Sequence, residues 1–372
     1  MKFNRRNLVH YLIFLSYFSF FLLTYTFSFF YKKKNRLIYT MGHRLDGNLE
    51  SFLELSSKLD YEIRYLTFDK DLIRNHDFCY SYINFKNIYS LLNCKLIFAT
   101  HGILMHKLIK LKKIKTINIG HGVQTSIIDM QNSDLKLFDE VWISSSLDKK
   151  IITNDCNYKE NNLFITGFLK YYSLLKKELQ NIQELQGDFV LYAPTASPKA
   201  EKEDIFNAFN IEFLTVLDKL GAKNNLKIII KPHYNDYFYK NIDLDILAFI
   251  KSSKNLIYFE DINLENSTDL IMISELLITD WSSIYLDFLT IDKPIIFLDS
   301  FKRRKNITLS RYFENDFIER CKNYSDLEIS FEKFKKNEKS FINHKLKKYI
   351  FQDFDLESIE ANYIQRIINF NV

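Results

Sequence analysis

The chain has 372 residues, which is more than one ordinary compact domain and predicts two. Apolar residues make up 47% of it and Gly and Pro are scarce, so wholesale disorder and collagen-like or linker-rich architectures are excluded. The formal charge of +5 comes from residues 1–36, which hold seven of the 51 basic residues and no acidic ones. The rest of the chain has 44 basic and 46 acidic residues and is nearly neutral, so no nucleic-acid partner is expected.

The first predicted element is a membrane anchor within residues 1–36. Residues 8–31, LVHYLIFLSYFSFFLLTYTFSFFY, contain no Asp, Glu, Lys or Arg. This stretch exceeds the roughly 20 residues that a helix needs to cross a bilayer, and no signal-peptide cleavage site follows it. A single membrane-spanning helix is expected, with a peripheral, in-plane helix as the alternative because Phe, Tyr, Ser and Thr are frequent. The expected localisation is the cell membrane, with the lipid bilayer as a partner.

Residues 37–180 are predicted to form a first Rossmann-like domain. Short apolar, β-rich runs alternate there with helical patterns, as in a parallel sheet covered on both faces. A helix is expected at 47–59, and strands are expected at 36–40, 61–68, 95–100, 115–120, 140–145 and 162–167.

Residues 181–350 are predicted to form a second Rossmann-like domain, and residues 351–372 a helix that packs back on the first. Helices are expected at 201–220, 282–291 and 355–370, and strands at 189–194, 226–232, 256–261, 275–280 and 294–299. The predicted fold class is therefore α/β, with two doubly wound domains facing a cleft.

Polar residues follow several of the predicted strands in the second half. Open α/β sheets bind ligands beyond the carboxyl ends of their strands. Thr195 follows the strand at 189–194, and Lys231 and His233 end the next one. Lys231 supplies positive charge and His233 a hydrogen-bond donor, and both suit a phosphate oxygen. An ordinary surface loop is the alternative for these residues.

The segment TDWSS places Asp280, Ser282 and Ser283 between a predicted strand and a predicted helix. Asp280 or Ser282 would be the N-cap of that helix. The hydroxyls and the first-turn N–H groups suit a phosphate or diphosphate. Asp and Ser are also common caps for purely local reasons, so helix capping alone is the alternative.

His121 lies between two glycines, which leaves its imidazole accessible, as a general base requires. A tight turn without catalytic meaning is the alternative. The acidic residues form no obvious catalytic pair, and the sequence contains no Walker loop, G-x-G-x-x-G, G-x-S-x-G or zinc motif. The four cysteines are far apart in the sequence, and no metal or cofactor is expected.

Taken together, several motifs resemble the CDP-glycerol glycerophosphotransferase family, whose members prime or polymerise teichoic-acid-like chains. The likeness covers about residues 37–370, and GHG at 120–122 stands where the family has its first-half His-Gly motif. The motifs that carry it are LYAPT (191–195), KPH (231–233), LLITDWSSIYLDF (276–288) and KPIIFLD (293–299).

The resemblance implies an enzyme with a glycosyltransferase-B-like (GT-B-like) fold. It would transfer a glycerol or ribitol phosphate from a CDP-activated polyol to a hydroxyl of a membrane-linked or polymeric glycan acceptor, releasing CMP. Such transfer builds teichoic-acid-like or capsular surface polymers. A cytosolic donor places the catalytic domains on the cytoplasmic side; a lumenal arrangement is the alternative, because N-x-S/T triplets occur.

The resemblance also implies roles for the candidate residues. His121 would deprotonate the acceptor hydroxyl, and His233 would stabilise the phosphates of the donor. Ser282 and Ser283 would hold the diphosphate. The residues expected to line or organise the nucleotide side are Thr195 and Asp280.

The chain departs from the family pattern on the acceptor side. The usual His-Gly-Thr-Pro-Leu-Lys reads His-Gly-Val-Gln-Thr-Ser from His121 to Ser126, and Ala196 replaces an aromatic residue. Two other functions therefore stay open. One is an inverting GT-B glycosyltransferase that uses a nucleotide sugar, and the other is a membrane-tethered binding protein with a degenerate site.

Overall fold

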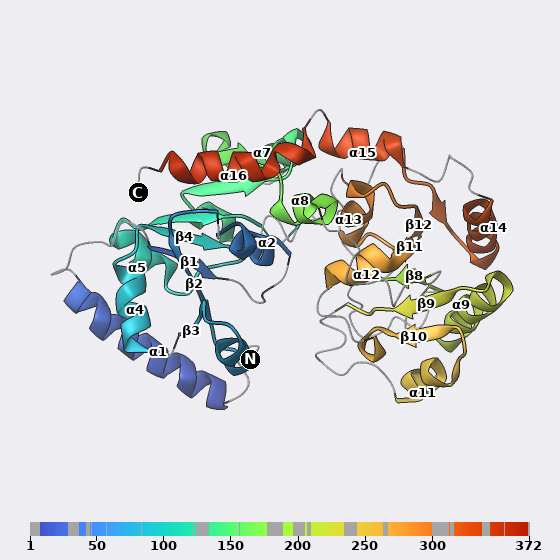
Figure 1. Cartoon of the computed structure of the whole chain (residues 1–372), viewed down its shortest axis with the longest axis horizontal. Helices are drawn as coiled ribbons and strands as arrows, with labels where there is room; N and C mark the ends of the chain where they lie inside the picture. The colour runs from blue at the N-terminus through green and yellow to red at the C-terminus, as the bar shows by residue number, and fades with distance from the viewer. Residues whose placement is uncertain are drawn as a thin grey trace. The chain divides into compact units, whose positions relative to one another are not determined.

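The structure is a computed structural model. It describes residues 8–28, 37–41, 45, 47–56, 58–82, 84–120, 122–123, 134–155, 157–176, 189–195, 205–206, 210–233, 244–262, 267–299, 312, 316–336, 343–352 and 354–370. The chain divides into two compact units (Figure 1). The first contains Met1–Gly122, Asn132–Tyr172 and Phe354–Val372, and the second contains Val123–Gln131 and Ser173–Asp353.

The described part of the first unit is built on a parallel sheet of seven strands in the order β3-β2-β1-β4-β5-β6-β7. The strands are β1 (Leu37–Met41), β2 (Glu62–Thr67), β3 (Cys79–Ser81), β4 (Leu96–Ala99), β5 (Lys115–Asn118), β6 (Glu140–Ile143) and β7 (Leu163–Ile165). The helices are α1 (Leu8–Phe27), α2 (Gly47–Ser56), α3 (Lys70–Asn75), α4 (Phe85–Leu92), α5 (His106–Leu111), α7 (Ser146–Asn154) and α16 (Ile359–Ile368), and α8 (Leu169–Lys176) begins in this unit.

Helices cover both faces of this first sheet. The hydroxyl of Tyr39 in β1 donates to the carbonyl of Asn87 in α4. Phe98 of β4 is paired with Thr40, the next residue along β1, and its ring packs against Phe52 of α2 with ring centroids 4.6 Å apart. Because side chains alternate along a strand, α4 and α2 lie on opposite faces. This confirms the prediction of a parallel sheet covered on both sides.

Helix α1 packs into the first unit through one stripe of its surface. Figure 1 shows it beside α4. The stripe follows the helical spacing of four, three and four residues, and its members Tyr17, Phe21, Thr24 and Ser28 are all buried. The ring of Tyr17 lies 5.6 Å from that of Tyr82, measured between centroids. This part of the apolar N-terminal segment therefore belongs to the core of the first unit.

Among the residues that the structure describes, no helix is both long and apolar enough to cross a membrane. The membrane-spanning helix predicted at residues 8–31 is therefore not confirmed, and the cell-membrane localisation inferred from it is wrong. Hydropathy counts apolar residues without regard to the face on which they lie, and here the face of Tyr17 and Phe21 is buried inside a folded unit.

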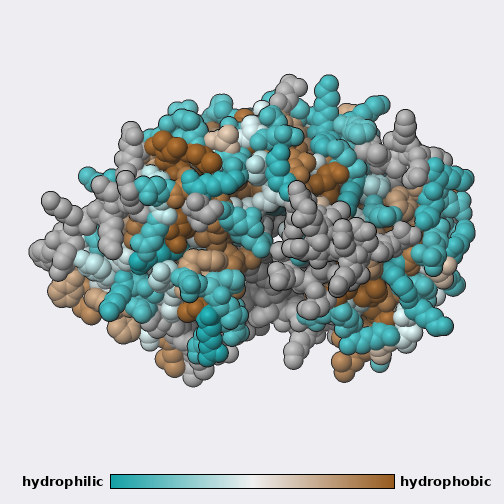
Figure 2. All heavy atoms as spheres, viewed as in Figure 1, coloured by the Kyte–Doolittle hydropathy of each residue, from teal (hydrophilic) through white to brown (hydrophobic). Residues whose placement is uncertain are grey.

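Other apolar side chains of α1 are exposed. They form part of the tan and brown surface at the lower left of Figure 2. Their exposed fractions range from 39 to 54%, and they are Leu12, Leu15, Phe20, Leu22, Leu23 and Phe27.

The second unit contains a parallel sheet whose six described strands have the order β10-β9-β8-β11-β12-β13. The strands are β8 (Phe189–Tyr192), β9 (Lys227–Ile230), β10 (Leu256–Tyr258), β11 (Ser274–Thr279), β12 (Ile295–Leu298) and β13 (Arg320–Cys321). The helices are α9 (Ile211–Asn224), α11 (Leu244–Ser252), α12 (Ser267–Ile273), α13 (Ile284–Thr290), α14 (Tyr324–Lys335) and α15 (His344–Phe351). Short 3₁₀ helices lie at Phe259–Asp261 in this unit and at Asp134–Leu137, Glu160–Asn162 and Leu356–Ser358 in the first unit.

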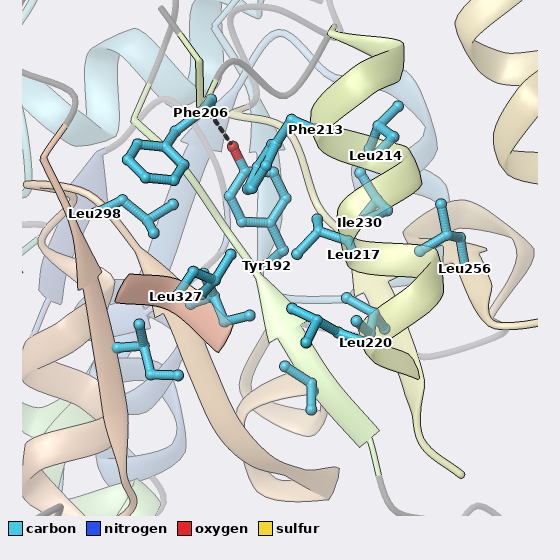
Figure 3. Packing of buried hydrophobic residues seen from close by; sticks show 14 of the residues in the cluster. Tyr192, Phe206, Phe213, Leu214, Leu217, Leu220, Ile230, Leu256, Leu298 and Leu327 are labelled. Atoms are coloured by element: carbon cyan, nitrogen blue, oxygen red, sulfur yellow. Dashed lines mark hydrogen bonds between the residues drawn. The ribbon is translucent and has the colours of Figure 1, made fainter. Parts of the chain in front are cut away.

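The described core of the second unit lies between its sheet and the helices α9, α11 and α14. Asn210 caps this helix by accepting from the Glu212 N–H, and Asn225 ends it in the left-handed conformation. Figure 3 shows the side chains of α9 packed against Tyr192 of β8, whose hydroxyl donates to the Phe206 carbonyl at 2.9 Å. The hydrogen bond satisfies the one polar atom of this ring, so Tyr192 is buried without an unmet donor.

Helix α16 is tied to the sheet of the first unit by a buried ion-pair network. Glu140 in β6 is nearly buried, and its Oε2 accepts from Arg366 Nε at 3.0 Å and Nη2 at 2.8 Å. The indole N–H of Trp142 donates to the same oxygen at 3.0 Å, and Lys115 Nζ lies 2.7 Å from Oε1. The Glu140 carboxylate is thus paired at both oxygens, as a buried charge requires.

Candidate active site

The candidate residues of the second unit lie along one edge of its sheet. Strand β8 is parallel to β9 on one side and to β11 on the other. The carboxyl ends of the three strands therefore meet, and each leads into a segment with candidate polar groups. Thr195 follows β8, Lys231 and His233 follow β9, and Asp280, Ser282 and Ser283 follow β11.

Asp280 connects two of these segments. Its side chain is 1% exposed, and Oδ1 accepts from the Thr195 N–H at 2.9 Å and from the Thr195 hydroxyl at 2.7 Å. The same oxygen accepts from the Ser282 N–H at 3.1 Å. Next to it, the Thr279 hydroxyl donates to the Ala193 carbonyl at 2.6 Å. The loops after β8 and β11 are thereby held together by side chains of β11 and its first loop residue.

This geometry gives Asp280 an organising role. A buried carboxylate that already accepts three hydrogen bonds would repel a phosphate rather than bind it. Its charge instead strengthens the bonds that orient Thr195 and Ser282. The family resemblance implied that Asp280 lines or organises the nucleotide side, but its bonds to Thr195, 85 positions away, could not be read from the sequence.

The helix after this loop begins later than predicted. Its N-cap is Ser283, and the Ser283 side chain makes no capping hydrogen bond. Neither Asp280 nor Ser282 is the N-cap, so that prediction is wrong. The reason lies in the turn before the helix, where the Ser282 N–H donates to Asp280 two residues earlier, as in an Asx turn. The Ser283 hydroxyl is therefore not used to cap α13.

Lys231 and His233 lie directly beyond β9. The Lys231 N–H donates to the Tyr192 carbonyl at 2.9 Å, which continues the β8–β9 ladder to this residue. Pro232 is buried, whereas the side chains of Lys231 and His233 are half-buried. A cation and a hydrogen-bond donor thus stand on the opposite side of β8 from the serines of β11.

On the first unit, His121 lies outside the described residues, and its predicted role as a base stays a prediction. The neighbouring Gly120 is described and has a φ of +63°, in the left-handed region that favours glycine. Its N–H donates to Asn118 Oδ1 at 2.9 Å, and its carbonyl accepts from Asn48 Nδ2 at 3.1 Å. Asn48 was not among the predicted site residues; the sequence signal for it is a polar residue four positions before the buried Phe52, on the same helix face.

The described residues contain no group of three or more His, Cys, Asp or Glu side chains that could hold a metal ion. The polar groups at the described edge of the second sheet are hydroxyls, a lysine, a histidine and the groups that orient them. The cleft predicted between the two domains stays a prediction.

Two parallel α/β units, one of them with this polar edge, define a GT-B-like protein. The solved structure of the wall teichoic acid polymerase TagF has this fold, with a TM-score of 0.72, 14% sequence identity and 96% of each chain covered. Identity this low shows the fold alone. The predicted α/β class with two parallel sheets is confirmed.

The chain belongs to the CDP-Glycerol:Poly(glycerophosphate) glycerophosphotransferase family, whose sequence pattern matches residues 22–353. The resemblance found in the motifs is confirmed, and with it the assignment to a family of transferases.

Relatives in this family are bacterial proteins of teichoic acid synthesis. The chain is 25% identical over 291 residues to the minor teichoic acid biosynthesis protein GgaB of Bacillus subtilis (strain 168). The matched region covers 75% of this chain and 27% of GgaB. It is 27% identical over 236 residues to the teichoic acid glycerol-phosphate primase of the same organism, covering 57% of each. The chain thus spans a quarter to just over half of these curated relatives.

Proposed function

We propose that this chain transfers a polyol phosphate, either glycerol phosphate or ribitol phosphate, from a CDP-activated donor to an acceptor hydroxyl. The product is a teichoic-acid-like or capsular surface polymer. Membership of the family supports the reaction class. The observation that supports a nucleotide-dependent site in this chain is the bonded set of Thr195, Asp280 and Ser282 at the carboxyl edge of the second sheet, with Lys231 beside it.

The second unit is the donor side in this proposal. The hydroxyls of Ser282 and Ser283 and the ammonium of Lys231 bind the diphosphate, and His233 donates a hydrogen bond to a phosphate oxygen. Thr195 lies on the nucleotide side, held by Asp280. Fixed donors of this kind stabilise negative charge that builds up on the leaving phosphate without having to reorganise during the reaction.

The first unit is the acceptor side, and His121 is the base. The acceptor oxygen forms a bond to the phosphorus that carries the polyol, and the bond from that phosphorus to the bridging oxygen breaks. The acceptor proton passes to the His121 imidazole, and CMP leaves with the bridging oxygen. No metal or cofactor enters these steps, and positioning and electrostatic stabilisation supply most of the rate enhancement.

The printed names of relatives support the type of polymer. GgaB and the primase are named for teichoic acid synthesis, and one of the TagF structures is of a variant soaked with CDPG. The acceptor end of this chain differs from the usual family motif, so the proposal leaves the acceptor at the level of a polymeric or glycan hydroxyl.

The experiment is a comparison of donors with the purified chain. CDP-glycerol, CDP-ribitol, a UDP-sugar and a CMP-sugar are each supplied together with a glycerol-phosphate oligomer, and CMP or UDP release is measured. We expect CMP release from CDP-glycerol or CDP-ribitol, and no release of UDP from the UDP-sugar or of CMP from the CMP-sugar. Consumption of a nucleotide sugar, or no binding of any CDP-polyol, would contradict it.

Variants of two histidines make the test specific to the site. His233→Ala lowers CMP release about 10- to 100-fold if His233 stabilises the donor phosphates. His344→Ala is the matched control, because His344 is an exposed histidine at the start of α15 in the same unit. Equal activity of the His233→Ala and His344→Ala proteins would remove His233 from the mechanism.

A further inference from the structure

Asn48 is a buried amide that joins three separate segments of the first unit. It lies in the first turn of α2, is fully buried, and its Nδ2 donates to the Ile119 carbonyl at 2.8 Å and to the Gly120 carbonyl at 3.1 Å. Its Oδ1 accepts from the Lys170 N–H in α8 at 3.1 Å. Both ends of the amide are therefore used.

The turn that Asn48 holds is fixed from other directions as well. The Gly120 N–H donates to Asn118 Oδ1 at 2.9 Å. A Cβ at Gly120 would lie 3.0 Å from Cζ of Phe168, so this ring closes directly over the turn. Both backbone polar groups of Gly120 are thus hydrogen-bonded and one side is covered by an aromatic ring, which fixes the turn at the carboxyl end of β5.

A buried asparagine at this position has a cost that an apolar residue would not have. Removing an amide from water is unfavourable unless its hydrogen bonds are replaced inside the protein. Neighbouring Leu49 and Phe52 of α2 pack as ordinary core residues. What Asn48 adds is direction, because its two donated bonds orient the successive carbonyls of Ile119 and Gly120.

We propose that Asn48 is a positioning residue for the transfer reaction, acting by fixing the Gly120 carbonyl from which the chain continues to His121. This inference rests on the proposed function, in which His121 takes the acceptor proton. A base must be held close to its proton, and a displacement of about 1 Å can cost about 100-fold in rate. Asn48 thereby acts through the backbone of Gly120 and contacts no substrate.

The test uses variants that remove the amide donor. Asn48→Ala removes all three hydrogen bonds of the side chain without adding charge, and Asn48→Asp keeps the shape but turns an oxygen toward the two carbonyls. Asn93→Ala is the matched control: Asn93 is also buried in the first unit and donates to the Tyr89 carbonyl at 2.8 Å, but it lies at the opposite edge, just before β4 begins.

The first readout does not need activity. Histidine rings labelled with ¹³C are followed by ¹H–¹³C NMR, with the His121 signal identified by its loss in His121→Gln. Asn48→Ala and Asn48→Asp are expected to move the His121 signal and change its titration, while the His233 signal and the signals of Asn93→Ala stay at their wild-type positions. A His121 signal unchanged in both Asn48 variants would overturn the inference.

The second readout is kinetic, with CDP-glycerol as donor. Both Asn48 variants are expected to lower kcat about 10- to 100-fold with the donor KM unchanged, because the proposed donor groups belong to the second unit. Asn93→Ala, compared at equal folded fraction, keeps its kcat. Wild-type kcat in the Asn48 variants, or a loss equal to that of Asn93→Ala, would overturn the inference. A wild-type chain with no turnover would instead defeat the proposed function, leaving the NMR result to decide on Asn48.

Discussion

The carboxylate of Asp280 accepts two hydrogen bonds from Thr195, one from its N–H at 2.9 Å and one from its hydroxyl at 2.7 Å. Thr195 lies in the segment after β8, and Asp280 begins the segment after β11. These bonds join two motifs that are distant in the sequence. They also place a buried charge beneath the proposed diphosphate site, where it organises the loops instead of meeting the ligand.

Asp280→Ala is expected to lower the unfolding free energy by about 2–4 kcal/mol, because three donors lose their acceptor in a buried setting. It should also weaken CDP-glycerol binding. Urea unfolding and calorimetric titration measure the two effects separately.

The control for Asp280 is Asp148→Ala in the first unit. Asp148 is also buried and accepts from the N–H and the hydroxyl of Ser144, at 3.0 and 3.2 Å. Both variants should lose stability, but only Asp280→Ala should lose affinity for the donor. A donor affinity that falls equally in both would show that the loss comes from instability alone.

Lys231→Ala is expected to weaken CDP-glycerol binding about tenfold, which corresponds to about 1.4 kcal/mol and to one lost charge-assisted contact. Lys227→Ala is the control for the position of the charge, since Lys227 is an exposed lysine at the other end of β9. Binding is measured by calorimetry at low and high salt. The idea fails if the two variants bind equally, or if the wild-type affinity does not fall with salt.

Arg366→Met is expected to lower the unfolding free energy by about 2–4 kcal/mol, because it leaves the buried Glu140 without its double hydrogen bond. The comparison is Lys58→Met, which removes a more exposed ion pair to Glu360 on the same helix α16. That pair should contribute about 0–1 kcal/mol. Urea unfolding of both variants provides the measurement, and similar losses would contradict the assignment of Arg366 as the main attachment of α16.

Lys293 gives the protein a defined pH response. Burial lowers the pKa of this lysine from 10.5 to about 8. Its ammonium donates to the carbonyls of Ile271 and Ser274 near the end of α12, at 3.1 and 2.8 Å. Between about pH 8 and 10.5 the unfolded chain holds a proton that the folded chain has lost, so this group makes the unfolding free energy rise with pH.

The measurement compares the wild type with Lys293→Met at about pH 7.5 and about pH 9.5. The wild type should gain stability relative to the variant at the higher pH. Taking the difference between the proteins removes the opposing effect of Cys79 and Cys321, whose pKa values burial raises to about 11. A difference that does not change with pH would place the Lys293 pKa near its ordinary value.

Sequence patterns were sufficient for several buried strands of four residues. The runs at 95–100, 226–232 and 294–299 became β4, β9 and β12, because continuous β-rich apolar runs have few other stable uses in a chain of this kind. The edge strands β7 and β10 have three residues each and were predicted because they lie in apolar runs, whereas β3 and β13, with three and two residues, contain polar or charged residues and were not predicted. Such short strands depend on pairing with a neighbour and carry no periodicity of their own.

The sequence predicted which residues share an edge of the sheet but not how they are bonded. Thr195, Lys231 and Asp280 follow strands, and the rule on carboxyl ends places such residues on a common edge once the strands are neighbours. The rule says nothing about which atoms are bonded. The bond between Thr195 and Asp280 and the use of Asn48 depend on contacts between distant segments, which no local pattern records.

The membrane helix predicted for the N-terminal segment was not confirmed, for a different reason. Its composition predicted a membrane helix, because a run of apolar residues has the same hydropathy whether it faces lipid or a protein core. Tyr17 and Phe21 lie in a stripe that also includes Thr24, whose hydroxyl bonds to the Phe20 carbonyl. The buried aromatic rings of this stripe fit a protein core, and the hydroxyls of Thr24 and Ser28 donate to carbonyls of the same helix.

The most direct measurement is a crystal structure of the chain with CDP-glycerol bound. The diphosphate should contact the hydroxyls of Ser282 and Ser283 and the ammonium of Lys231, with Asp280 still bonded to Thr195 and not to the ligand. A donor bound elsewhere, or a diphosphate that touches none of these three side chains, would contradict the proposed site.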